Sequence, residues 1–95
     1  MTWKIERISA EDGFTVFRLS GHIQSEHVMK IEEMISRESN RIALDLSELT
    51  LIDRDAVSYL ALCKQRGIQL RNSPWFLTEW ISKQESDYGS SNIKE

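Results

Sequence analysis

The chain lacks the features that mark several broad protein classes. Its 95 residues include one cysteine, Cys63, so no disulfide within the chain is possible, which fits a reducing compartment. No apolar run approaches the roughly 20 residues of a membrane span, and the opening Met-Thr-Trp-Lys-Ile-Glu has no signal-peptide pattern. The net charge is −3 and no basic run exceeds two residues, which argues against binding to nucleic-acid phosphates. We therefore expect a cytoplasmic protein that binds neither nucleic acid nor membrane.

The first part of the chain predicts a hairpin followed by a helix. Trp3 and Ile5 alternate with Lys4 and Glu6, which predicts a strand over residues 3–8. Residues 14–20 predict a second strand, with apolar side chains on both faces, and Asp12-Gly13 between the strands is typical of a tight turn. Gly21 is expected to end the second strand. Ser25 can cap a helix that runs to about Glu38, with an apolar stripe made by Val28, Ile31, Met34 and Ile35.

The second part predicts two further strands, each followed by a helix. A strand over residues 41–46 and a loop over 47–50 lead to Asp53, which can cap a helix over 54–66. The side chains expected to face inward on that helix are Ala56, Val57, Leu60, Ala61 and Cys63, and Gly67 is placed to end it. A short strand over residues 68–71 follows. Ser73 then caps a last helix with Pro74 at its first position and with Leu77, Trp80 and Ile81 as its apolar stripe.

The order of these elements predicts the fold class. The order β-β-α-β-α-β-α is typical of an α/β domain with a small mixed sheet of four strands. The helix-linked strands should be parallel, and the helices should lie mainly on one face, which leaves the other face thinly covered. We expect a single domain over residues 1–81 and a polar tail over 82–95 that is frayed or disordered.

The start of the helix after Asp53 is the most informative segment for function. The Asp53 carboxylate can accept hydrogen bonds from the first turn, and Asp55 lies where the helix dipole favours negative charge. Arg54 does not suit the dipole and should point outward, where it either stays solvated or binds an acidic group. A strand that delivers a helix start to its carboxyl end is a common way to build a recognition site.

Three segments resemble a known family. They are Phe17-Arg-Leu-Ser-Gly21, Leu44-Asp-Leu-Ser-Glu-Leu-Thr-Leu-Ile-Asp53 and Gly67-Ile-Gln-Leu-Arg-Asn-Ser-Pro74. With the element order, they resemble the STAS domain of sulphate transporters and anti-sigma-factor antagonists, from about Trp3 to Ile81. The resemblance implies a regulatory protein–protein interaction domain without catalytic activity or cofactor. Its implied partner is an anti-sigma factor or another kinase-like regulator in a bacterial pathway of transcription control.

The chain departs from this family at the position of its phosphorylation switch. Antagonist members carry Asp-Ser-Ser-Gly, in which the second serine is phosphorylated by the partner kinase. Here the segment reads Asp53-Arg54-Asp55-Ala56, so an aspartate stands at the phospho-acceptor position. Asp55 carries about one negative charge, against about −1.5 to −2 for phosphoserine. Either Asp55 holds a state that resembles the phosphorylated one, or the domain has left the kinase circuit.

The candidate partner surface combines the Gly21–Ser25 loop, the Ser47–Thr50 loop and the helix start. We expect His22, Ser47, Asp53, Arg54 and Asp55 to contribute to it. Asp53 and Asp55 also have a purely structural interpretation as helix-start residues, and His22 as an ordinary polar surface residue. No histidine is spaced to form a metal site with these carboxylates.

Other interpretations use other parts of the chain. Trp75 falls outside the apolar stripe of the last helix, so Trp75 with Phe76 is a candidate second interface. One alternative function is a small-ligand or nucleotide-binding module that depends on Arg54. Another is a structural subunit that forms a homodimer through the thinly covered sheet face or the Trp75 helix.

Overall fold

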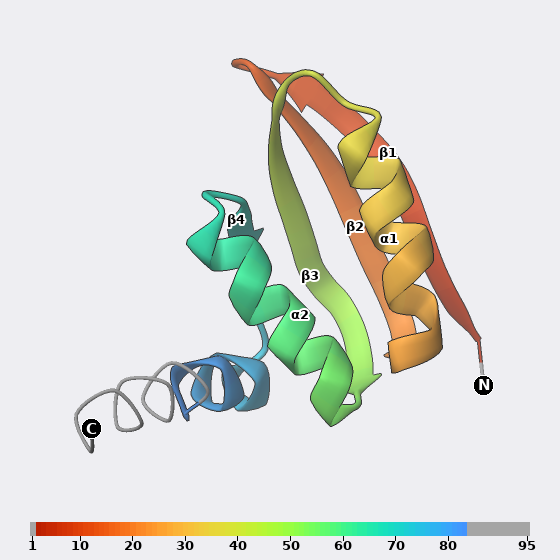
Figure 1. Cartoon of the computed structure of the whole chain (residues 1–95), viewed down its shortest axis with the longest axis vertical. Helices are drawn as coiled ribbons and strands as arrows, with labels where there is room; N and C mark the ends of the chain where they lie inside the picture. The colour runs from red at the N-terminus through yellow and green to blue at the C-terminus, as the bar shows by residue number, and fades with distance from the viewer. Residues whose placement is uncertain (1, 84–95) are drawn as a thin grey trace.

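The fold is built on one mixed sheet of four strands in the order β1-β2-β3-β4 (Figure 1). The computed structural model describes residues 2–83, without the side chains of residues 9–11. Its strands are β1 (Trp3–Glu11), β2 (Phe14–Ile23), β3 (Arg41–Ile52) and β4 (Gln69–Arg71). The β1–β2 pair is antiparallel, whereas β2–β3 and β3–β4 are parallel. This confirms the predicted hairpin, the parallel helix-linked strands and the α/β class.

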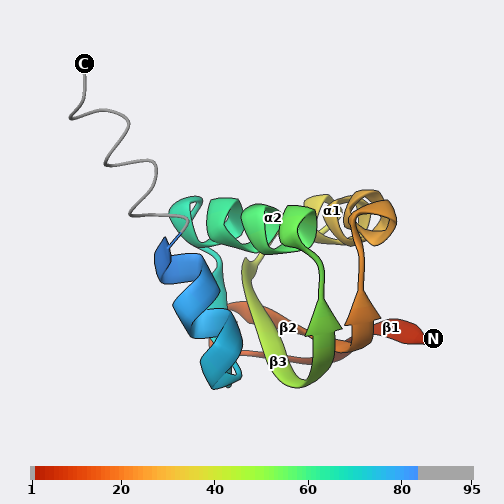
Figure 2. The same ribbon diagram turned by 90° about the horizontal axis from the view of Figure 1, so that it is seen from below.

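The helices lie mainly on one face of this sheet. They are a 3₁₀ turn, η1 (Ser25–His27), that leads into α1 (Val28–Ser36), then α2 (Arg54–Gln65) and a helix over residues 75–83. Figure 2 shows α1 and α2 side by side above the sheet, with the last helix at the side of the sheet that ends in β4. The opposite face of the sheet carries no helix from residues 2–83. Within residues 2–83, every helix is too short or too polar to span a bilayer.

The core lies between the sheet and the two helices above it. Phe17 and Leu19 of β2 and Leu44 and Leu46 of β3 point towards the helices and are fully buried. The side chains predicted to face inward on α2 are all buried, and Ile31 and Ile35 of α1 are buried with Val28 and Met34 partly so. The helical and strand periodicities therefore identified this core correctly.

The predicted loop over residues 47–50 is wrong, because β3 continues to Ile52. The β2–β3 register gains one residue in β3 between the pairs Arg18–Asp45 and Ser20–Glu48, and another between Gly21–Leu49 and His22–Leu51. These two bulges place buried side chains at Leu46, Leu49 and Ile52, three residues apart. A three-residue spacing matches no strand period, so the sequence pattern resembled a loop.

Gly21 does not end the second strand, and Ser25 does not cap the first helix. Gly21 has φ of 82°, and the strand continues past it because Ile23 still pairs with Ile52. Gln24 is the N-cap of η1, and its backbone N–H donates to Nδ1 of His27 at 2.9 Å. The backbone N–H of Ser25 instead donates to the side-chain carboxylate of Asp53. At the other end, α1 stops at Ser36 rather than Glu38.

The last helix begins one residue later than predicted. The Pro74 carbonyl accepts hydrogen bonds from the backbone N–H groups of Leu77 and Thr78, so Pro74 precedes the first helical residue. Leu77 and Ile81 are buried, but Trp80 is 44% exposed, contrary to its predicted place in the apolar stripe. Trp80 lies on the far side of Leu77 from Ile81, at the margin of the contact face. Residues 82 and 83 continue this helix, and residues 84–95 of the predicted tail lie outside the described residues.

We predict that Gly21→Ala destabilises the fold more than Gly13→Ala does. Both glycines have positive φ, but a Cβ at Gly21 would also overlap the carbonyl oxygen of Thr2, whereas one at Gly13 meets open space. Gly13→Ala should lower the free energy of unfolding by about 1 kcal/mol and Gly21→Ala by at least about 2 kcal/mol. Urea unfolding of both variants measures the difference, and equal losses would contradict it.

Candidate functional site

The Asp53 carboxylate joins the starts of two helices. Its Oδ1 accepts from the backbone N–H of Ala56 at 2.9 Å, which confirms its predicted role as N-cap of α2. Its Oδ2 accepts from the backbone N–H of Ser25 at 2.9 Å, in the turn that leads into α1. The Asp53 N–H in turn donates to the carbonyl of Ile23 at 3.1 Å. One side chain therefore fixes both helix starts at the carboxyl ends of β2 and β3.

Charged and apolar side chains lie within a few residues of this junction along the chain. Arg54 and Asp55 are exposed in the first turn of α2. Leu51 at the end of β3 is 47% exposed, and Met29 in the first turn of α1 is 82% exposed. The half-buried His22 lies opposite Leu51 in the β2–β3 pair. We call these five residues the helix-start surface.

The turn before α1 is held by an aromatic contact. The Trp3 ring stacks on the His27 imidazole with ring centroids 4.2 Å apart and an interplanar angle of 18°. The His27 Nδ1 accepts the Gln24 N–H, so this nitrogen carries no proton in the observed arrangement. Two contacts of His27, the ring stack with Trp3 and the hydrogen bond from Gln24, therefore hold the turn whose Ser25 N–H donates to Asp53.

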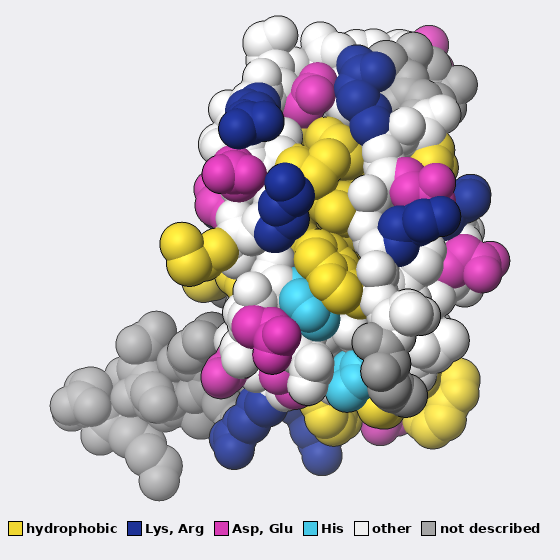
Figure 3. All heavy atoms as spheres, turned by 90° about the vertical axis from the view of Figure 1, so that its right-hand side faces the viewer, with side chains coloured by type: hydrophobic (Ala, Val, Ile, Leu, Met, Phe, Trp, Pro, Cys, Tyr) yellow, Lys and Arg dark blue, Asp and Glu magenta, His cyan; other side chains and the backbone are white. Residues whose placement is uncertain are grey.

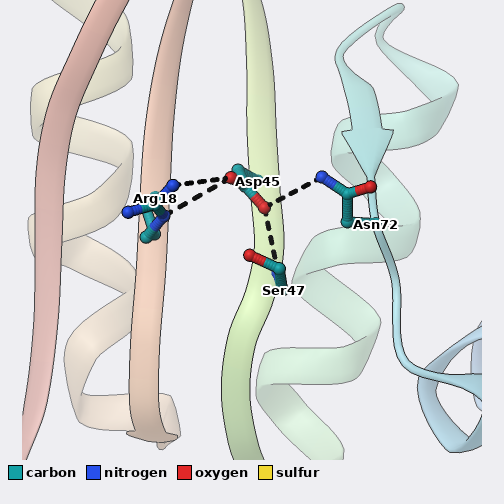
Figure 4. Close-up of polar contacts among 4 residues, drawn as sticks. All are labelled: Arg18, Asp45, Ser47 and Asn72. Carbon is teal, nitrogen blue, oxygen red and sulfur yellow. Dashed lines mark hydrogen bonds and ion pairs between the residues drawn. The ribbon is translucent and has the colours of Figure 1, made fainter.

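A second polar junction lies on the helix-free face, around Asp45 (Figure 4). Asp45 is 7% exposed in the middle of β3. Its Oδ2 accepts from Nη2 and Nε of Arg18 at 3.3 and 3.4 Å, and its Oδ1 accepts from Ser47 N at 3.0 Å and Asn72 Nδ2 at 3.3 Å. Burial raises the pKa of Asp45, but the hydrogen bonds from Ser47, Asn72 and Arg18 outweigh it and leave the pKa below its ordinary value. This carboxylate thus links β2, β3 and the residue after β4.

Ser47 belongs to the Asp45 junction rather than to the helix-start surface. It lies at the first bulge of β3, five residues before the strand ends at Ile52, and Figure 4 shows it beside Asp45. The structure brings His22, Asp53, Arg54 and Asp55 to the end of the sheet that carries both helix starts, and it leaves Ser47 apart. The sequence did carry a signal for Asp45, because a carboxylate inside an apolar strand must find partners.

A third polar contact ties the two helices of the upper layer together. The Tyr59 hydroxyl of α2 donates to Glu32 Oε1 of α1 at 2.6 Å, and Arg66 donates to both Glu32 oxygens at 2.9 and 3.3 Å. The hydrogen bonds from Arg66 and then Tyr59 hold the pKa of Glu32 below its ordinary value. Behind this contact, burial raises the pKa of the Cys63 thiol, which favours its neutral, unreactive form.

The candidate second interface lies on the last helix. Trp75 is 78% exposed, and its ring makes a T-shaped contact with that of Phe76, with centroids 6.2 Å apart and an interplanar angle of 89°. Phe76 is partly buried against the core and so holds the exposed indole in place. The predicted exposure of Trp75 is therefore confirmed, and the second interface stays a prediction.

Two further observations concern ligands. A shallow depression of about 600 Å³ lies on the helix-free face over β1 and β2, lined in part by Lys4, Glu6, Arg18 and Glu48. Among residues 2–83, no group of three or more His, Cys, Asp and Glu side chains is close enough to hold a metal ion.

We predict that Asp53→Ala loosens both helix starts at once. The substitution removes the acceptor for two backbone N–H groups, so the free energy of unfolding should fall by about 1–2 kcal/mol. Hydrogen exchange of the Ser25 and Ala56 amides should accelerate together, because both lose the same acceptor. Faster exchange at Ala56 alone would show that the bond to Ser25 contributes nothing.

We predict that Asp45→Asn reduces the dependence of stability on acidic pH. Because the folded pKa of Asp45 is depressed, its ionised form adds stability above its unfolded pKa, and this stability is lost as pH falls through the folded pKa. The variant should be about 1–2 kcal/mol less stable than wild type at neutral pH, and this difference in stability should narrow as the pH falls below about 4, the ordinary pKa of an aspartate. Urea unfolding of both proteins from neutral to acidic pH measures this difference in stability, and Glu79→Gln, at an exposed site, is the control.

Comparison with known proteins identifies no relative, so the function is argued from the geometry and the sequence motifs. No protein-family model matches this chain, and a search of curated proteins also finds no match.

Proposed function

We propose that this chain is a non-catalytic regulatory domain of STAS type that binds a protein partner through the helix-start surface. The observation that carries the proposal is the Asp53 carboxylate, which holds both helix starts at once. The STAS-like motifs supply the class of partner, an anti-sigma factor or a kinase-like regulator in the bacterial cytoplasm. Binding would be a docking event without a covalent step.

The composition of the helix-start surface supports recognition of a protein. Met29 and Leu51 expose apolar area that water solvates poorly, and Met adapts well to the shape of a partner. Arg54 is exposed in the first turn of α2 and can form paired hydrogen bonds with a carboxylate of the partner. Because both helix starts are already fixed, little conformational entropy is lost on docking.

The charge at position 55 supports a constitutive interaction. Asp55 is exposed in the first turn of α2, where the helix dipole favours a carboxylate. It stands at the position that the STAS pattern gives to the phosphorylated serine, so its negative charge is permanent. We therefore propose a partner that accepts this charge and whose binding is not switched by phosphorylation at this position.

The small-ligand alternative has weaker support. The depression on the helix-free face has carboxylates as well as basic groups in its lining, and it lies over β1 and β2 rather than at Arg54. A nucleotide site needs a net positive or amide-rich cradle for its phosphates.

The test compares partner binding by the wild-type chain with binding by Arg54→Ala and Asp55→Ser. Each protein is used as bait in a pull-down with mass spectrometry, and the affinity of a recovered, purified anti-sigma factor or kinase is then measured by calorimetry. Each substitution should weaken binding by about tenfold or more, as expected for residues near the centre of an interface.

Arg37→Ala and Glu79→Ser are the matched controls, because both residues are exposed and lie outside the helix-start surface. They should leave the affinity unchanged. Equal affinities for the wild type, the two surface variants and the controls would show that the partner binds elsewhere. If the recovered kinase phosphorylates Ser25 or Thr50, the exposed hydroxyl residues that adjoin this surface in the chain, the proposal of a constitutive interaction fails.

A further inference from the structure

The outer edge of β1 has free backbone groups over a regular stretch of five residues. β1 is the first strand in the sheet order, and no other strand within residues 2–83 pairs with its outer side. The Thr2 carbonyl accepts from the His22 N–H opposite it, so residues 2, 4 and 6 direct their backbone groups towards β2. The N–H and C=O groups of Trp3, Ile5 and Arg7 therefore point outward. A register irregularity after Arg7 ends this stretch.

The side chains along this stretch are complementary to a second copy of themselves. If two β1 strands pair antiparallel about a two-fold axis at Ile5, Ile5 lies opposite Ile5, and Lys4 lies opposite Glu6 of the second copy. The Lys4 and Glu6 side chains are 65% and 41% exposed and share one face, with Nζ and Oε2 3.7 Å apart within one chain. In the paired strands each lysine would face a glutamate across the two-fold, which is a favourable cross-strand pair.

We propose that this protein forms a two-fold symmetric homodimer by antiparallel pairing of β1 with β1 of a second copy, centred on Ile5. In this register the hydrogen-bonded positions are Trp3, Ile5 and Arg7, the three residues whose backbone groups point outward. Roughly six backbone hydrogen bonds would form across the axis. The charged pairs and the free backbone groups thus select the same register independently.

Apolar side chains beside the β1 edge also favour pairing with a second copy of the chain. Trp3 and Ile5 of β1 and Val28 and Met34 of α1 are only partly buried. Figure 3 shows a strip of hydrophobic surface on this side of the molecule, with charged side chains of both signs along its flanks. Pairing of the edges would bring the α1 layers of the two copies together and cover apolar surface from both.

Features that usually protect a sheet edge are compatible with this pairing. Charged side chains and bulges commonly prevent edge strands from aggregating. Here the two charges are of opposite sign and are symmetrically placed about Ile5, so they disfavour other registers and favour this one. The irregularity after Arg7 lies outside the five paired residues and leaves them intact. The two-fold pair uses the β1 edge of both copies, so no β1 edge remains free for a third chain.

Charge reversal tests the proposal on the full chain. Sedimentation equilibrium across micromolar to millimolar concentrations should show a monomer–dimer equilibrium for the wild type. Lys4→Glu and Glu6→Lys should each weaken dimerisation by about tenfold or more, because both symmetry-related pairs become repulsive. The double variant K4E/E6K should restore the wild-type dissociation constant. Lys83→Glu, at an exposed site on the last helix, controls for the change in net charge.

A cross-link tests the register itself. Residues 4 and 6 of opposite chains would form a non-hydrogen-bonded pair, with Cα atoms about 4.5 Å apart, which suits a disulfide. The K4C/E6C variant, oxidised with glutathione disulfide, should give a covalent dimer on non-reducing gels, whereas K4C alone should not. The native Cys63 is buried and should not interfere.

Several outcomes would overturn the proposal. A wild type that stays monomeric at millimolar concentration excludes this dimer. A dimer that is insensitive to Lys4→Glu but lost in Trp75→Glu assigns the interface to the last helix. Failure of K4E/E6K to restore dimerisation, or equal cross-linking of K4C alone, shows that the register is wrong.

Discussion

The hydrogen bonds of the Asp53 carboxylate are the constraint on which the recognition end of the domain depends. Two parallel strands end side by side, and each leads into a helix whose first amides would otherwise lack partners. One carboxylate serves an amide from each, Ser25 on one side and Ala56 on the other. Because the two helix starts share this acceptor, hydrogen bonds as well as packing set their relative position. The exposed side chains beside them are therefore presented on a fixed frame.

A second carboxylate, that of Asp45, joins separate segments on the helix-free face of the sheet. No helix from residues 2–83 covers that face, so the sheet there depends on polar contacts between strands rather than on a second apolar layer. Asp45 receives donors from Arg18, Ser47 and Asn72, which belong to three different segments. Such a group is favourable only when its partners are complete, because a buried carboxylate without them is costly. The long central strand is thereby held to both of its neighbours.

The two surfaces that we propose for binding use different physical features. The helix-start surface combines exposed apolar and charged side chains on a rigid frame, which suits a partner of different sequence. The β1 edge offers unpaired backbone groups and a charge pattern that is complementary to itself, which suits a second copy. The first lies where the parallel strands end, and the second runs along the side of the sheet. A dimer of this kind would present two helix-start surfaces to its partners.

Sequence patterns alone predicted the element order, the hairpin, the parallel strands, the inward face of α2 and the N-cap at Asp53. These follow from local periodicity and from turn and cap chemistry, which act over a few residues. Local patterns did not predict the continuation of β3 to Ile52, the bond between Ser47 and Asp45, the exposure of Trp80 or the bond between Ser25 and Asp53. The extension of β3 follows from its pairing with β2, and the Ser25–Asp53 bond joins residues far apart in the chain. Asp45 and Ser47 are near neighbours in the chain, but the bulge beside them also arises from the pairing of β3 with β2. The exposure of Trp80 depends on which side of the last helix contacts the core. Local rules therefore predicted which elements form, whereas contacts between elements decided where the site residues meet.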